Sequence, residues 1–178
     1  MKLNRRSFIT RGAASAALFS IMPREVLGKM GGNNNYIAPS DQLTRGLIGV
    51  GGIGRSSSHF VSDQSCRLVA LCDVDQKHLD SAFDAAKQKW GDELKTYHDF
   101  RELIHDPNVD IVHIATPPHW HGIMSVEAAN AGKDIFCEKP IDHDVNKILE
   151  VKAALENSNV KYQVGFNRRF DHNFKAAR

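Results

Sequence analysis

Apolar positions along residues 45–166 follow two alternating patterns. Short continuous apolar runs occupy residues 46–50, 68–72, 111–115 and 135–137. Runs of this length indicate strands that are buried on both faces, as in a parallel sheet. Between the runs, apolar residues recur at helical spacing, for example at Leu79, Ala82, Phe83, Ala86 and Trp90. This alternation predicts an α/β fold, a doubly wound parallel sheet with helices on both faces.

Weaker signals complete the predicted series. Residues 95–97 read as a short edge strand, and Asp99 begins a helix as its N-cap. A helix over about 120–131 ends at Gly132. A further helix carries an apolar stripe at Val145, Ile148, Leu149 and Leu155, and residues 162–166 form the last strand. Because ligands of such sheets bind beyond the carboxyl ends of the strands, candidate chemistry is sought at 49–54, 73, 116–121, 138–140 and 167–169.

The first strand runs into a glycine loop, residues 49–54, with the sequence Gly49-Val50-Gly51-Gly52-Ile53-Gly54. Its context is that of a dinucleotide-binding loop, because a strand precedes it and a helix follows it. Gly49 permits the tight turn, Gly51 lets the backbone approach a pyrophosphate, and Gly54 lets helix and strand pack closely. We therefore predict a Rossmann-type domain that binds a nicotinamide dinucleotide; a glycine turn without a ligand is the alternative.

The second strand ends at Asp73, 19 positions after Gly54. An acid at this place accepts hydrogen bonds from the adenosine ribose, and its charge repels a 2′-phosphate. Asp73 thus favours NAD as the cofactor. NADP stays possible, since Arg55 is close in sequence and an arginine can accommodate that phosphate. A simple strand-end acid is the alternative reading of Asp73.

Residues 116–121, Thr-Pro-Pro-His-Trp-His, form a stiff loop that leads into a helix. We predict that Thr116, Pro117 and His121 line the cofactor groove. His119 and His121 suggest a metal pair as the alternative, but no carboxylate or third ligand stands nearby in sequence, and no metal site is predicted.

Glu138-Lys139-Pro140 follows the strand at 135–137, so both charges face the ligand crevice. Lys139 is placed to polarise a hydroxyl or carbonyl beside the nicotinamide, and burial would lower its pKa toward a range useful in proton transfer. The Lys139–Pro140 bond is a candidate for the cis form, which would fix the direction of the lysine. An exposed salt-bridged pair in a turn is the alternative.

Charge is distributed unevenly along the 178 residues, whose formal net charge is +2. Residues 1–29 hold six basic and one acidic residue, which leaves 17 basic against 20 acidic residues and a formal charge of −3 for the rest. No basic face for nucleic acid is expected. The cysteines Cys66, Cys72 and Cys137 lack metal spacing, and those at 72 and 137 lie in apolar runs typical of buried side chains.

Residues 4–10, Asn-Arg-Arg-Ser-Phe-Ile-Thr, resemble a twin-arginine export motif. The apolar run that follows, residues 12–22, is too short and too rich in Ala and Ser to span a bilayer. We therefore predict an export signal over 1–29, a Gly/Asn/Pro/Ser-rich linker over 30–44, and a dinucleotide-binding domain over 45–166. The expected location is the periplasm. A frayed basic tail is the alternative for 1–29, and the cleavage site is left open.

Taken together, the motifs resemble the Gfo/Idh/MocA family of oxidoreductases from about Arg45 to Arg178. The resemblance rests on four segments, which are 49–54, Thr-Pro-Pro at 116–118 with His121, Cys-Glu-Lys-Pro at 137–140, and Gly-Phe-Asn-Arg-Arg-Phe at 165–170. It implies a Rossmann domain, hydride transfer between a nicotinamide and a sugar or polyol hydroxyl, Lys139 at the reaction centre and Glu138 near the nicotinamide ribose. The stretch 164–171 looks most like inositol 2-dehydrogenases.

The resemblance also implies a C-terminal substrate domain that completes the site and makes homo-oligomers. Residues 167–178 would begin the connection to it, so this chain alone is expected to bind nucleotide without turnover. Two other functions stay open. One is an NAD-dependent glycosidase of the same superfamily, against which Lys139 argues. The other is a truncated, non-catalytic nucleotide-binding protein.

Overall fold

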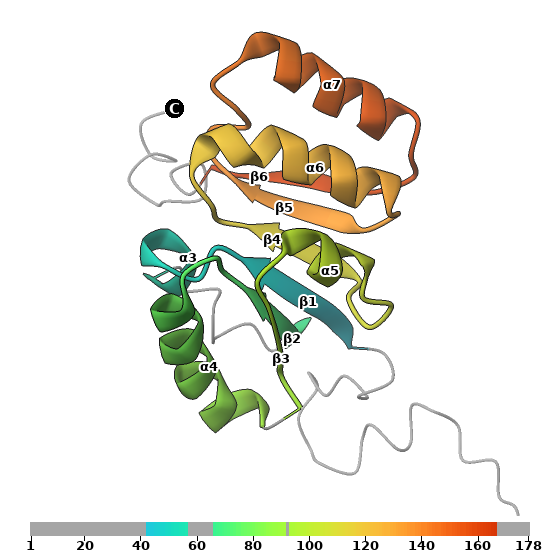
Figure 1. Cartoon of the computed structure of the whole chain (residues 1–178). Helices are drawn as coiled ribbons and strands as arrows, with labels where there is room; N and C mark the ends of the chain where they lie inside the picture. Colours follow the sequence, from blue (N-terminus) through green and yellow to red (C-terminus); the bar gives the residue numbers. More distant parts are fainter. Residues whose placement is uncertain (1–41, 57–65, 92, 167–178) are drawn as a thin grey trace, which may run out of the picture. The chain divides into compact units, whose positions relative to one another are not determined.

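The structure is a computed structural model that describes residues 42–56, 66–91 and 93–166. Six parallel strands form one sheet in the order β3-β2-β1-β4-β5-β6 (Figure 1). The strands are β1 Leu43–Ile48, β2 Cys66–Cys72, β3 Lys95–Tyr97, β4 Ile111–Ile114, β5 Asp134–Glu138 and β6 Tyr162–Gly165. The predicted doubly wound parallel sheet is confirmed. Its strand order reverses between β1 and β4, where such folds bind dinucleotides.

Helices cover the sheet in two layers. They are α3 Gly52–Ser56, α4 Gln76–Trp90, α5 Phe100–His105, α6 His121–Asn130 and α7 Val145–Glu156, with a 3-10 turn, η2, at Pro118–Trp120. Leu79, Ala82 and Ala86 of α4 pack with Leu47 of β1 in one core cluster. Ile48, the next residue of β1, belongs to a second cluster with residues of α5 and α6. Successive strand residues thus serve opposite faces, which explains why the strands are apolar throughout.

Local capping sets where the helices begin and end. The side chains of Asp75, Asp99 and Asp144 accept backbone N–H bonds at the starts of α4, α5 and α7. The predicted helix start at Asp99 is confirmed. Gly132 follows α6 with φ of +72°, a conformation that favours glycine, so the predicted stop is confirmed as well.

One strand boundary and the inward face of one helix differ from the sequence-based expectation. Strand β1 begins at Leu43, inside the segment expected to be a linker, because Thr44 bonds to Asn108 and Asp110 across the sheet. The apolar stripe of α7 is also different, because Val145 and Leu149 are 68% and 56% exposed. Its inward positions are 148, 151 and 155, which share one face by their i, i+3, i+7 spacing.

A polar cluster ties the amino-terminal edge of the sheet together. Asp106, which is buried, accepts hydrogen bonds from the Lys95 ammonium and the Tyr97 hydroxyl, both at 2.8 Å, and from the backbone and side chain of Asn108. Burial by itself would raise the pKa of Asp106, but these donors together hold that pKa well below its ordinary value. The cluster lies away from the carboxyl ends of the strands and is structural. In the part of the chain that is described, no helix has both the length and the apolarity of a membrane span.

Candidate functional site

The strand register aligns residues at the carboxyl ends of four strands into one row along that edge of the sheet. Cys72 pairs with Ile48, Ile48 with Ile114, and Ile114 with Cys137. The next residues in the row are therefore Asp73, Gly49, Ala115 and Glu138. Three strand spacings separate the strand of Asp73 from that of Glu138, roughly 14 Å. The row brings an acid, the glycine loop and the Glu-Lys-Pro segment to one edge.

The glycine loop packs too closely for side chains at two of its positions. Gly49 has φ of +85°, and a Cβ there would come within 2.8 Å of backbone atoms of Ala115 and Thr116. A Cβ on Gly54 would overlap the carbonyl oxygen of Gly49. By contrast, Gly52 and Ile53 are exposed at the start of α3, and a Cβ on Gly52 would meet nothing within 4 Å. The part of the expected helix beyond residue 56 lies outside the described residues.

Asp73 is joined to the glycine loop directly. Its Oδ2 accepts the backbone N–H of Val50 at 2.9 Å, and its Oδ1 accepts that of Asp75 at 2.9 Å. His78 Nδ1 lies 4.0 Å from the same carboxylate, whose side chain is 11% exposed. Each oxygen keeps a lone pair for a further donor. The carboxylate is therefore held in place at the crevice and is able to accept hydroxyl groups.

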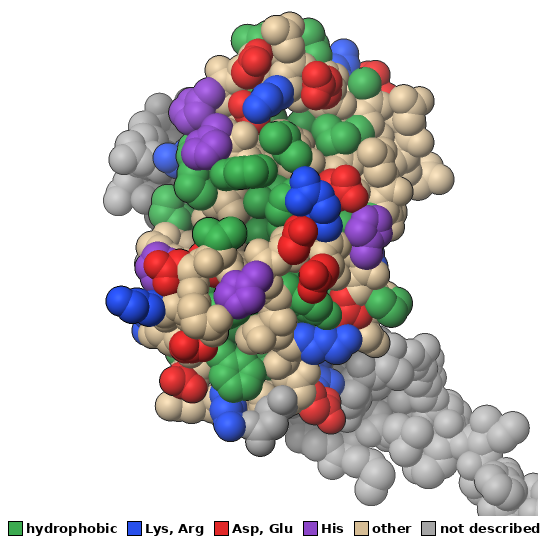
Figure 2. All heavy atoms as spheres, viewed as in Figure 1, with side chains coloured by type: hydrophobic (Ala, Val, Ile, Leu, Met, Phe, Trp, Pro, Cys, Tyr) green, Lys and Arg blue, Asp and Glu red, His purple; other side chains and the backbone are tan. Residues whose placement is uncertain are grey.

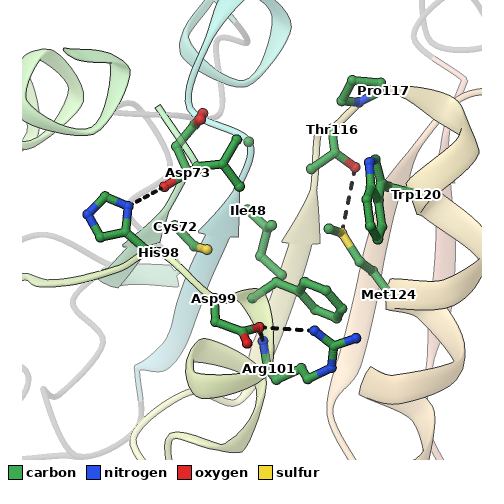
Figure 3. A pocket seen from close by; sticks show the side chains of 13 residues that line it. Ile48, Cys72, Asp73, His98, Asp99, Arg101, Thr116, Pro117, Trp120 and Met124 are labelled. Carbon is green, nitrogen blue, oxygen red and sulfur yellow. Dashed lines mark hydrogen bonds and ion pairs between the residues drawn. The ribbon is translucent and has the colours of Figure 1, made fainter. Parts of the chain in front are cut away.

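A cleft of about 550 Å³ opens beside this row (Figure 3). Four of the predicted site residues line it, namely Gly49, Asp73, Thr116 and Pro117. Its lining is mainly apolar and includes the side chains of Ile48, Cys72, Phe100, Trp120 and Met124. Hydrophobic side chains also gather in the middle of the face seen in Figure 2. A mostly apolar cleft with a few polar groups at its edge is typical of sites for small molecules and cofactors.

Several residues that line the cleft were not predicted from the sequence. His98 lines the cleft, and its Nδ1 and Nε2 lie 3.1 Å from the Asp73 carbonyl oxygen and 2.8 Å from the Gln76 side-chain oxygen. His98 directly follows β3, so the rule about carboxyl ends, applied to that edge strand too, would have found it. Trp120 also lines the cleft, and its ring centroid lies 6.3 Å from that of Phe100. No local pattern indicated that contact.

His121 was predicted to line the cofactor groove, but the structure places it elsewhere. It is 1% exposed and is absent from the lining of the cleft. Its Nδ1 lies 2.7 Å from the carbonyl oxygen of Pro140, and its Nε2 lies 2.7 Å from that of Thr116. Both ring nitrogens thus face backbone carbonyl oxygens. His121 can affect a bound ligand only indirectly, through the two loops that carry Thr116 and Pro140. His119 is exposed, and no metal-binding group of His, Cys, Asp and Glu occurs among the described residues.

Glu138 and Lys139 lie at the same edge but outside the cleft lining. The Glu138 carboxylate is buried, and its Oε1 lies 3.8 Å from Nε2 of the buried His113. The Lys139–Pro140 peptide bond is cis, as considered from the sequence. Lys139 is exposed, so the burial expected for it from the sequence is not present in this structure. The predicted segment 167–169 lies outside the described residues.

The cysteines take no part in the site as nucleophiles. All three are buried. Burial raises the pKa of the Cys72 thiol to about 12, and it raises that of Cys137 to about 11. Thiols of this kind are inert. Cys72 contributes only its apolar surface to the floor of the cleft.

Fold, glycine loop and strand-end acid together define a Rossmann-type dinucleotide-binding domain. Residues 43–166 match the model of the Gfo/Idh/MocA oxidoreductase family with an NAD-binding Rossmann fold, and the chain belongs to this family. It is 36% identical over 135 residues to the uncharacterized oxidoreductase YrbE of Bacillus subtilis, covering 75% of this chain and 38% of that protein. It is 39% identical over 134 residues to an inositol 2-dehydrogenase of Rhizobium meliloti, covering 75% and 38%.

Solved structures agree with this assignment. The fold is similar to that of scyllo-inositol dehydrogenase from Lactobacillus casei, a structure with bound NAD(H) and scyllo-inositol, with a TM-score of 0.68 and 31% identity over 76% of this chain and 39% of that one. The chain thus spans about two fifths of the length of the relatives it matches.

Proposed function

We propose that this chain is the cofactor-binding part of an NAD-dependent dehydrogenase that acts on a CH–OH group of a sugar, polyol or inositol. The observation that carries the proposal is the row along the carboxyl edge, in which Asp73, the glycine loop and Glu138 stand at the carboxyl ends of β2, β1 and β5, on both sides of the point where the strand order reverses. The similarity to inositol dehydrogenases supports the substrate class.

The residues present suit a nicotinamide dinucleotide. Close packing at Gly49 and Gly54 keeps the loop backbone free of side chains where a pyrophosphate would approach. Asp73 keeps acceptor capacity for the ribose hydroxyls, and its charge favours NAD over NADP. Thr116 and Pro117 would border the cofactor, with Gly51, Gly52 and Ile53 along the loop. When bound, the nicotinamide supplies the hydride acceptor.

Lys139 is the residue proposed to handle the proton. As an exposed ammonium next to the carboxyl end of β5, it is able to donate a hydrogen bond to the substrate oxygen and, as the free amine, to take its proton. Glu138 lies beside it, and we propose that it contacts the nicotinamide ribose.

Calorimetric titration of the 178-residue chain tests cofactor binding. We expect NAD to bind, NADP to bind more weakly, and Gly49→Ala to abolish binding of both. Absence of NAD binding by a chain whose circular dichroism spectrum shows it folded would refute the proposal.

Turnover is tested on the longest reading frame that contains this chain, with a panel of inositols, polyols and sugars. NADH formation that is lost in Lys139→Met and kept in Lys152→Met, a change on the exposed face of α7, is the expected result. Turnover retained in Lys139→Met would remove the role of the lysine. Release of free sugar from glycosides without net NADH would instead identify a glycosidase.

We further propose that the protein is exported to the periplasm by the twin-arginine route. The support is the sequence Arg5-Arg6 followed by Phe8 and Ile9 and a mildly apolar run. Replacing Arg5 and Arg6 together by Lys is expected to leave a reporter fused after residue 44 in the cytoplasm. Equal periplasmic yield from the substituted and natural segments would refute export by this route.

A further inference from the structure

The two hydrogen-bond partners of His121 belong to different parts of the site. Thr116, whose carbonyl oxygen faces Nε2, follows β4 and lines the cleft. It also packs against the glycine loop, since the space a Cβ of Gly49 would need is taken by backbone atoms of 115 and 116. Pro140, whose carbonyl oxygen faces Nδ1, follows Lys139 directly. One buried ring therefore connects the cofactor side of the edge to the turn that carries the lysine.

The chemistry of the two contacts is restrictive. Carbonyl oxygens accept hydrogen bonds and never donate them, so each 2.7 Å contact is a hydrogen bond only when the facing nitrogen carries a hydrogen. The ring is 1% exposed, so both contacts are buried.

A second contact holds the same turn to the same helix. The carboxylate of Asp142, which is buried, accepts the backbone N–H of Gly122 at 3.1 Å as well as those of His143 and Asp144. A Cβ on Gly122 would come within 2.6 Å of that carboxylate. The first two residues of α6 thus both bind the turn at 139–144.

We propose that His121 is a positioning residue with two separable functions, which rests on the dehydrogenase function proposed above. The Nε2 bond to Thr116 holds the loop at 116–118 against the glycine loop and serves cofactor binding. The Nδ1 bond to Pro140 holds the Lys139 turn and serves turnover. The ring holds both contacts at 2.7 Å in the folded protein.

Two conservative variants separate the two functions. In His121→Asn the amide nitrogen takes the place of Nδ1, so the Pro140 bond is kept and the Thr116 bond is lost. In His121→Gln the amide nitrogen takes the place of Nε2, so the opposite holds. Both quantities are measured on the longest reading frame that contains this chain. We expect the Asn variant to raise the Kd for NAD about tenfold, as loss of one buried hydrogen bond predicts, and to keep kcat within about threefold of that of the natural protein. The Gln variant should keep the Kd and lose at least about tenfold in kcat.

The control is His105→Asn, a change in an exposed histidine at the far end of α5 that should alter neither quantity. If the role of His121 were merely structural, both variants would raise the Kd for NAD and lower kcat in parallel with the loss of stability. That outcome, or an exchange of the two expected patterns, would overturn the proposal.

Backbone amide NMR of the 178-residue chain tests the two contacts without turnover, so its result is independent of the dehydrogenase function. Amide signals that stay unchanged in both variants would overturn the proposal. His121→Asn should move the amide signals of residues 49–54 and His121→Gln those of 141–144. If NAD binding fails while these shifts appear, the dehydrogenase proposal fails and the connection through His121 stands.

Discussion

Replacing Gly49 by alanine tests whether the glycine loop is shaped by its packing against the segment after β4. At φ of +85° an L residue is strained by about 1–2 kcal/mol. The added Cβ would lie 2.8 Å from three backbone atoms of Ala115 and Thr116, which cannot rotate away as a flexible side chain would. Such overpacking costs about 1–3 kcal/mol. We therefore expect Gly49→Ala to lower the free energy of unfolding by about 3 kcal/mol.

The matched control is Gly52→Ala in the same loop. A Cβ there meets nothing within 4 Å, and the residue is the first of α3, where alanine is the better helix former. Its unfolding free energy should equal or slightly exceed that of the natural chain. Urea unfolding followed by circular dichroism measures both, and the thermal midpoint of Gly49→Ala should fall by roughly 12 °C for a domain of this size. A difference between the two variants below about 0.5 kcal/mol, the usual effect of a surface change, would refute the packing argument.

Three further predictions follow from other contacts. Asp73→Asn should lose one of the two carboxylate oxygens that accept backbone N–H groups, which lowers the free energy of unfolding by about 1–2 kcal/mol. Because the negative charge is gone, the variant should also show a smaller preference for NAD over NADP. Asp106→Asn should cost about 2–3 kcal/mol at neutral pH. Because the pKa of Asp106 is lowered by folding, that stability is present above its unfolded pKa, near 3.8, and is lost as pH falls further toward the folded value. The thiols of Cys72 and Cys137, whose pKa values burial raises to about 12 and about 11, should react with a disulfide reagent only when urea unfolds the chain.

Each of these has a distinct contrary result. If the ratio of the Kd for NAD to the Kd for NADP, measured by calorimetry, were the same in the natural chain and in Asp73→Asn, the Asp73 carboxylate would have no role in cofactor selection. A stability difference for Asp106→Asn that persists unchanged from pH 7 to pH 2 would show that ionisation of the carboxyl is not its source. Rapid thiol reaction in the folded protein would contradict the buried positions of the cysteines.

Even elements with weak local signals could be predicted from the sequence. Strand β3 at Lys95–Tyr97 and the N-cap at Asp99 occur where they were expected. The start of β1 was missed by three residues, because Leu43 and Thr44 are placed by pairing with β2 and by hydrogen bonds from Thr44 to the segment before β4 rather than by their own polarity. In α7 the inward face was misjudged, since apolar residues on both sides of a helical stripe look alike in sequence.

The sequence by itself determined the order of strands and helices, the glycine loop and the acid after β2, because each depends on properties of neighbouring residues: apolar runs, capping side chains and glycines at a turn. The strand-end rule then placed Asp73, Glu138 and Lys139 at one edge of the sheet. Only the tertiary structure decided that Val50 bonds Asp73, that His98 and Trp120 complete the cleft, and that His121 joins Thr116 to Pro140. These contacts connect different elements of the fold, and they depend on strand register and helix packing that no local pattern of residues encodes.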